Sequence, residues 1–138
     1  MQITPELIDR MNGNSLYNTL GIRLDSASQG MARSSLKPEP GVCWPFQGQP
    51  HGGILFTLMD TTMAWAVLSQ LDEGLNCATI HLDIQYTAPA RGDTFSCKAR
   101  VTHQTGRTVF LAAEIHDEPG GLVAAGQATF RVFKYDML

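Results

Sequence analysis

The stretch that decides the fold is His51-Gly-Gly-Ile-Leu-Phe-Thr-Leu-Met-Asp60-Thr-Thr-Met-Ala-Trp-Ala-Val-Leu-Ser-Gln-Leu71. After its two glycines it contains no further glycine or proline, and it is apolar on nearly every side, which is typical of a helix buried inside a protein. Asp60 lies near its middle, and no lysine or arginine occurs between Pro50 and Leu71. Because a buried carboxylate without a partner is costly, this aspartate indicates either a hydrogen-bonded structural residue or a functional cleft.

Composition places the chain among ordinary globular proteins. Its 138 residues are 43% hydrophobic and 17% charged, and the formal net charge is −3. We expect a single domain over residues 1–138. No cluster of lysine and arginine is present, which argues against a nucleic-acid partner.

The expected setting is the cytoplasm. The three cysteines, Cys43, Cys77 and Cys97, are widely spaced and odd in number, so they indicate neither a CxxC motif nor a disulfide framework. The N-terminus lacks the basic and apolar regions of a signal peptide. The long apolar stretch carries Asp60 and several threonines and has no flanking basic residues, so we do not expect it to span a membrane.

Outside that stretch, the chain divides into short helices, a loop and strands. We expect one or two short helices within residues 1–20, a hairpin over 22–37, a proline-rich loop over 38–50, and strands over 77–87, 94–103, 108–116 and 122–133. In the first of these four strands the pattern alternates, which predicts one face with Ala78, Ile80, Leu82, Ile84 and Tyr86 and another with Thr79, His81, Asp83 and Gln85.

The order of these elements predicts the fold class. Tight turns join antiparallel strands. A single long apolar helix with five to six antiparallel strands has one compact solution, in which the sheet wraps around the helix. We therefore expect an α+β protein with a central helix inside a curved antiparallel sheet.

Several motifs resemble one family. His51-Gly52-Gly53 with Asp60 further along the helix, the run Asp83-Ile-Gln-Tyr-Thr-Ala-Pro89, and the later runs Gly106-Arg-Thr108, Gly121-Leu-Val-Ala124 and Gly126-Gln-Ala-Thr-Phe130 resemble hotdog-fold acyl-CoA thioesterases. The similarity is to the phenylacetate-degradation and 4-hydroxybenzoyl-CoA type, and it covers roughly residues 20 to 134. It implies the hotdog fold, an acyl-CoA substrate and no cofactor or metal.

The resemblance also implies a set of catalytic residues. The amides of Gly52 and Gly53, at the positive end of the helix, would bind the thioester carbonyl, with Gly52 as the main oxyanion donor. Asp60 would be the general base on water or a nucleophile, and these alternatives stay open. Thr79 would orient the water, and His51 would contact the thioester or the leaving group. Structural alternatives are a tight helix entry for the glycines and His51, and a hydrogen bond to threonine for Asp60.

One position departs from the family. Six residues before His51 the family usually has an amide side chain, and here that residue is Pro45. Gln47 and Gln49 lie near enough in sequence to supply the amide. Arg91 and Arg107 flank turns where family members meet the CoA phosphates, which guanidinium groups suit. The pool of apolar residues for an acyl pocket is Trp44, Phe46, Leu55, Phe56, Met59 and Met63.

The resemblance further implies assembly. Exposed sheet edges are usually covered, and the family pairs two chains into a homodimer, often a dimer of dimers in a homotetramer, with sites shared between subunits. A non-hydrolytic protein that binds acyl groups or CoA is the competing hypothesis. A hotdog dehydratase fits the glycine and aspartate spacing less well.

Overall fold

The structure, a computed structural model, describes residues 1–43 and 49–135. Two short helices open the chain, and one long helix separates a first pair of strands from the last four. The elements are α1 Pro5–Asn12, α2 Ser15–Leu20, β1 Ile22–Ser28, β2 Met31–Leu36, the short 3₁₀ helix η1 Pro40–Val42, α3 Gly52–Leu68, β3 Leu75–Tyr86, β4 Phe95–Thr105, β5 Thr108–Asp117 and β6 Leu122–Lys134.

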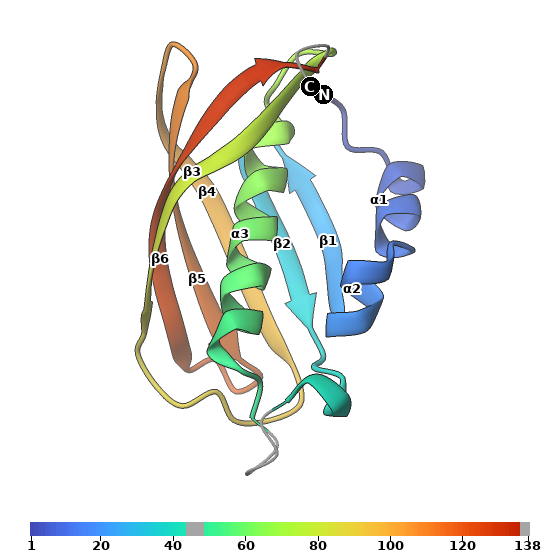
Figure 1. Ribbon diagram of the computed structural model, residues 1–138, viewed down its shortest axis with the longest axis vertical. Coiled ribbons are helices and arrows are strands. Elements are labelled where there is room, and N and C mark those ends of the chain that lie inside the picture. Colours follow the sequence, from blue (N-terminus) through green and yellow to red (C-terminus); the bar gives the residue numbers. More distant parts are fainter. Residues whose placement is uncertain (44–48, 136–138) are drawn as a thin grey trace.

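The six strands form one sheet in the order β1-β2-β4-β5-β6-β3, and every neighbouring pair is antiparallel. The sheet curves around α3, which lies along its inner face (Figure 1). This arrangement is the hotdog fold, so the fold class expected from the sequence is confirmed.

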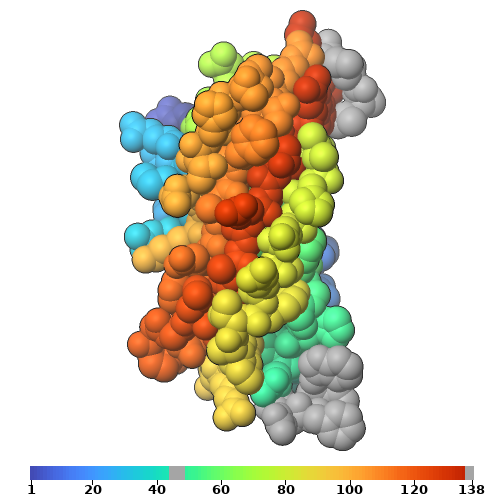
Figure 2. All heavy atoms as spheres, turned by 90° about the vertical axis from the view of Figure 1, so that its left-hand side faces the viewer, coloured from blue at the N-terminus to red at the C-terminus, as the bar shows by residue number. Residues whose placement is uncertain are grey.

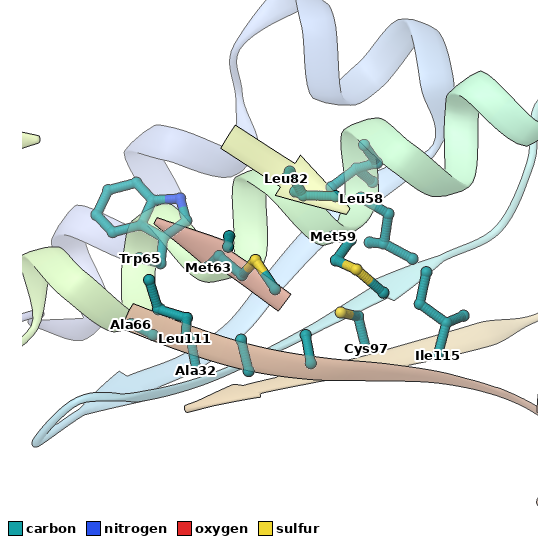
Figure 3. Packing of buried hydrophobic residues seen from close by; sticks show 14 of the residues in the cluster. Ala32, Leu58, Met59, Met63, Trp65, Ala66, Leu82, Cys97, Leu111 and Ile115 are labelled. Carbon is teal, nitrogen blue, oxygen red and sulfur yellow. The ribbon is translucent and has the colours of Figure 1, made fainter. Parts of the chain in front are cut away.

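The core lies between α3 and the sheet. From α3, Leu58, Met59 and Met63 are completely buried. They point toward inward side chains of the strands, among them Cys97, Leu111 and Ile115 (Figure 3). Buried polar groups of the helix are paired: the Thr62 hydroxyl donates to the Leu58 carbonyl at 2.6 Å.

One side of α3 is not covered. Phe56 is exposed, and Thr57, Asp60, Thr61 and Ala64 are only half-buried. These residues recur at helical spacing and form a stripe along the helix. The apolar run predicted a helix buried on all sides, whereas in the described chain Asp60 lies on this open stripe.

The two edges of the sheet differ. The β1 edge is covered by α1 and α2 (Figure 1), and the Asn12 side chain accepts from the Leu24 amide at 2.8 Å and donates to the Leu24 carbonyl at 2.9 Å. Asn12 thus takes the place of a neighbouring strand at that point. Among the described residues, no strand pairs with the outer edge of β3. Figure 2 shows β3 as a yellow-green band along the border of the sheet, with the green atoms of α3 beside it.

A β-bulge in β3 corrects the alternation expected from the sequence. Thr79 pairs with Phe130 and His81 pairs with Thr129, so Ile80 is an extra residue without a partner. The strand therefore changes phase at Ile80. Thr79 faces α3 before the bulge, and Leu82 faces the core after it. Ile80, expected on the same face as Leu82, is 60% exposed.

Candidate active site

The N-terminus of α3 is capped by its own preceding residue. His51 is the N-cap, and its Nδ1 accepts a hydrogen bond from the Gly53 amide at 2.8 Å. The Ile54 amide donates to the His51 carbonyl at 2.9 Å. A Cβ on Gly53 would lie 3.0 Å from His51 Nδ1, so glycine gives this cap its room. The helix-entry role considered for His51 from the sequence is therefore part of the structure.

The Gly52 amide differs from its neighbours. Within residues 1–43 and 49–135, no group accepts a hydrogen bond from it. It stands at the positive end of the helix dipole, where a bound oxygen carrying negative charge is favoured. Of the two glycine amides expected at the site, Gly53 is occupied by His51 and Gly52 is available to a ligand.

Tyr86 contacts the same first residue of α3. Its phenol donates to the Gly52 carbonyl at 2.7 Å. A Cβ built on Gly52 would lie 3.2 Å from Tyr86 Cζ and 3.3 Å from its hydroxyl. Tyr86 is not among the site residues predicted from the sequence. Because Tyr86 and Gly52 are 34 positions apart, only the path of β3 brings them together.

Asp60 is held by β3. The Thr79 hydroxyl donates to Asp60 Oδ1 at 2.6 Å. This contact depends on the bulge, because a strand without it could not turn both Thr79 and Leu82 toward the helix. Asp60 and Thr79, expected together from the family resemblance, are thus in direct contact.

Cys77, also in β3, contacts α3 one turn beyond Asp60. Its thiol donates to the Ala64 carbonyl at 3.8 Å. Burial, with a further contribution from the Asp60 carboxylate, raises the pKa of Cys77 to about 12. The thiol therefore stays protonated at neutral pH and is not an activated nucleophile.

The glycine amide and the acid are separated along α3. Asp60 follows Gly52 by eight residues, which corresponds to about 12 Å of helix at 1.5 Å per residue. A thioester carbonyl bound at the Gly52 amide would therefore be too far from Asp60 of the same chain for direct attack.

The remaining expected ligands are scattered in one chain. Arg91 lies in the connection after β3, at the same end of the molecule as the start of α3, whereas Arg107 lies in the β4–β5 turn at the opposite end (Figure 1). Gln49 precedes Pro50, which forms an isolated bridge with Cys43.

Other expected residues belong to the 38–50 loop. Trp44, Pro45, Phe46 and Gln47 lie outside the described residues. Among the residues that the structure describes, no group of three His, Cys, Asp or Glu side chains could hold a metal ion. No helix in the described ranges is long and apolar enough to cross a membrane.

Comparison with known proteins identifies the family. Residues 47–124 match the family model described as "Thioesterase superfamily". A relative from Halobacterium salinarum, named "Putative esterase VNG_1336C", is 34% identical over 137 residues, covering 91% of this chain and 89% of that protein. The chain belongs to the thioesterase superfamily.

Solved structures agree with this assignment. The Escherichia coli PaaI protein from the phenylacetic acid degradation operon superposes with a TM-score of 0.79 and 28% identity, covering 91% of this chain and 88% of that one. The BH2602 protein from Bacillus halodurans, solved with CoA, has a TM-score of 0.79 and 30% identity, with 91% and 80% of the two chains covered.

Proposed function

We propose that this protein hydrolyses acyl-CoA thioesters to the free acid and CoA. The observation that carries the proposal is the pairing of an available Gly52 amide at a helix N-terminus with an Asp60 carboxylate held by Thr79. Membership of the thioesterase superfamily and the likeness to a protein solved with CoA support the same reaction.

The roles follow from the chemistry of the thioester. Its carbonyl oxygen accepts from the Gly52 amide, which stabilises the negative charge that develops as the carbonyl carbon is attacked. Asp60 either removes a proton from the attacking water or attacks as a nucleophile and forms a mixed anhydride that water then cleaves. In both routes the C–S bond breaks and CoA leaves as its thiolate, which takes up a proton.

Three further residues assist in this proposal. Thr79 donates to Oδ1 of Asp60 and so fixes the direction of the carboxylate. His51 stands beside the glycines, where it contacts the thioester or the leaving sulfur. The Gly53 amide donates to the His51 side chain and holds it in place. Because Gly53 has no side chain of its own, it leaves room for the His51 ring at the start of α3.

The catalytic unit in this proposal is a homodimer, or a homotetramer built from two such dimers. The separation of about 12 Å along α3 is bridged when Asp60 of one subunit serves the Gly52 amide of the other. The uncovered edge of β3 and the open stripe of α3 lie side by side and supply the surface for pairing. Gln47, Gln49, Arg91 and Arg107 are proposed to bind the thioester and the CoA phosphates. A reducing cytoplasmic setting suits the three free cysteines.

A panel of short-chain, long-chain and aromatic acyl-CoAs tests the reaction, with release of free CoA followed by a thiol reagent. Hydrolysis of at least one class by the wild-type protein is expected. Release of no CoA from any of them, together with measurable binding of acyl-CoA, would instead identify a non-hydrolytic binding protein.

Mixing two inactive variants tests the shared site. Gly52→Pro removes the amide hydrogen at a helix position where proline is tolerated, and Asp60→Asn removes the acid. In a heterodimer of the two, one site keeps both wild-type groups. Random co-assembly should therefore restore about a quarter of wild-type activity if the sites are shared across a two-fold axis. No recovery, or a monomer in solution, would contradict shared sites.

A further inference from the structure

Two hydrogen bonds meet on one peptide group at the start of α3. The carbonyl of Gly52 accepts from the Tyr86 phenol at 2.7 Å. The amide of Gly53, which belongs to the same peptide group, donates to His51 Nδ1 at 2.8 Å. Tyr86 and His51 are therefore connected through a single rigid planar unit.

The bond from Gly53 shows which ring nitrogen of His51 is the hydrogen-bond acceptor. Because the Gly53 amide is a donor, Nδ1 of His51 must act as an acceptor and carries no proton. In a neutral imidazole the proton then resides on Nε2, which becomes a donor. A hydrogen bond accepted by the peptide oxygen polarises the peptide group and strengthens the bond donated by its N–H. Tyr86 therefore stabilises this tautomer of His51.

The Tyr86 phenol can donate its hydrogen bond to the Gly52 carbonyl at every neutral pH. Burial raises its pKa above the usual 10.0, so the hydroxyl keeps its proton throughout the neutral range. The side chain is nevertheless 50% exposed. It follows Leu82 and Ile84 on the inward phase that the Ile80 bulge sets, and this directs it to the start of α3.

The close contact with Gly52 adds a steric argument. The ring edge lies so near to the Gly52 α-carbon that a Cβ there would be 3.2 Å from Tyr86 Cζ. Tyr86 thus contacts the residue whose amide is the proposed oxyanion donor. A substitution at either position would disturb the other.

We propose that Tyr86 is a positioning residue for thioester hydrolysis, acting through the Gly52–Gly53 peptide to hold His51 as an Nε2–H donor. The proposal rests on the proposed function above. His51 in this state donates a proton or hydrogen bond to the leaving sulfur or the thioester oxygen. Tyr86 itself does not touch the reacting atoms.

Tyr86→Phe is the principal variant, because it removes only the hydroxyl. Loss of one neutral hydrogen bond predicts roughly a three- to tenfold lower kcat, with KM for acyl-CoA nearly unchanged, because the CoA contacts remain. Tyr135→Phe is the matched control: Tyr135 is an exposed tyrosine, 64% accessible, at the far end of β6. The control should match the wild type in both constants.

Coupling to His51 is tested by a double-mutant cycle. If Tyr86 acts through His51, then in a His51→Ala background the Tyr86→Phe change should alter kcat by less than about twofold. Full additivity of the two effects would overturn the proposal, and so would wild-type kcat in Tyr86→Phe.

A spectroscopic measurement keeps the proposal testable without turnover. In Tyr86→Phe the Gly53 amide proton should move upfield and the His51 nitrogen shifts should move toward a mixture of tautomers, whereas Tyr135→Phe should leave both in place. Unmoved signals in Tyr86→Phe would overturn the positioning role. If Tyr86→Phe shows these changes in chemical shift but the wild type hydrolyses no acyl-CoA, the proposed function is wrong, whereas the interaction by which Tyr86 positions His51 is supported.

Discussion

Gly126 of β6 faces Met59 of α3, and Gly126→Ala tests how tightly the central helix packs on the sheet. A Cβ at this position would lie 2.5 Å from Met59 Sδ and 2.7 Å from the Asp83 carbonyl oxygen. Met59 is completely buried and directly precedes Asp60 in α3. The methionine end can shift, but the Asp83 oxygen belongs to the backbone of β3, which is paired with β6 along its length.

The expected cost follows from these contacts. Overpacking a core by one methyl group destabilises a protein by about 1–3 kcal/mol. Replacing glycine by alanine returns about 0.4–1 kcal/mol through the unfolded chain. At the middle of both ranges, the net loss in the free energy of unfolding is about 1.3 kcal/mol, which corresponds to a decrease in Tm of roughly 4–5 °C for a chain of this size.

Thermal and urea unfolding, followed by circular dichroism, provide the measurement. Gly41→Ala is the matched control, because nothing lies within 4 Å of a Cβ built there; we expect it to change stability by less than about 0.5 kcal/mol. In a Met59→Val background, which lacks the sulfur, the additional cost of Gly126→Ala should be smaller than in the wild type. A Gly126→Ala protein as stable as the wild type would refute this account of the packing between α3 and β6.

Three further outcomes are expected. Thr79→Val keeps the shape of the side chain but removes the hydroxyl bonded to Asp60, so it should lower kcat by about tenfold. Thr79→Ser keeps a hydroxyl and should have a kcat close to that of the wild type. Equal rates of CoA release by the wild type and both variants would contradict a catalytic role for Thr79. Asn12→Ala should lose about 1–2 kcal/mol in urea unfolding because two backbone groups of Leu24 lose their partner; an unchanged midpoint would contradict the capping of the β1 edge. Burial raises the pKa of the Cys97 thiol to about 12 from the usual 9.0. The unfolded chain therefore loses this proton first, and the free energy of unfolding should fall as pH rises from about 9 toward 12. Cys97→Ala should make this fall less steep, and the same pH dependence in both proteins would contradict the role of Cys97.

The sequence predicted the architecture because its strongest signals are local. The apolar run from Ile54 onward predicts a helix that is covered by a sheet. The tight turns after it predict antiparallel strands. The position of α3, the open antiparallel sheet and the N-terminal helices all follow from such patterns.

The phase change in β3 could not be predicted in this way. Ile80 and Leu82 are both apolar and two apart, so they fit one uninterrupted alternation. The bulge at Ile80 arises from the pairing of β3 with β6, which is a non-local property. As a result, the inward direction of Thr79 had support only from the family resemblance.

The hydrogen bonds at the start of α3 and the exposure of one side of this helix could not be predicted from the sequence either. Histidine is not among the usual N-cap residues, yet His51 accepts from Gly53. The bond between Tyr86 and Gly52 depends on the length and curvature of β3. The open stripe of α3 was hidden because Phe56 and Ala64 are as apolar as the covered residues.

In the proposed reaction, Asp60 is the general base or the nucleophile. The most direct test is the rate of CoA release by Asp60→Asn under saturating acyl-CoA, beside the wild type and an Asp72→Asn control at an exposed aspartate. Loss of a general base or nucleophile predicts a kcat lower by about 10²–10⁴-fold, with Asp72→Asn unchanged. If Asp60→Asn releases CoA as fast as the wild type, Asp60 is not catalytic and its carboxylate serves only as a structural partner of Thr79.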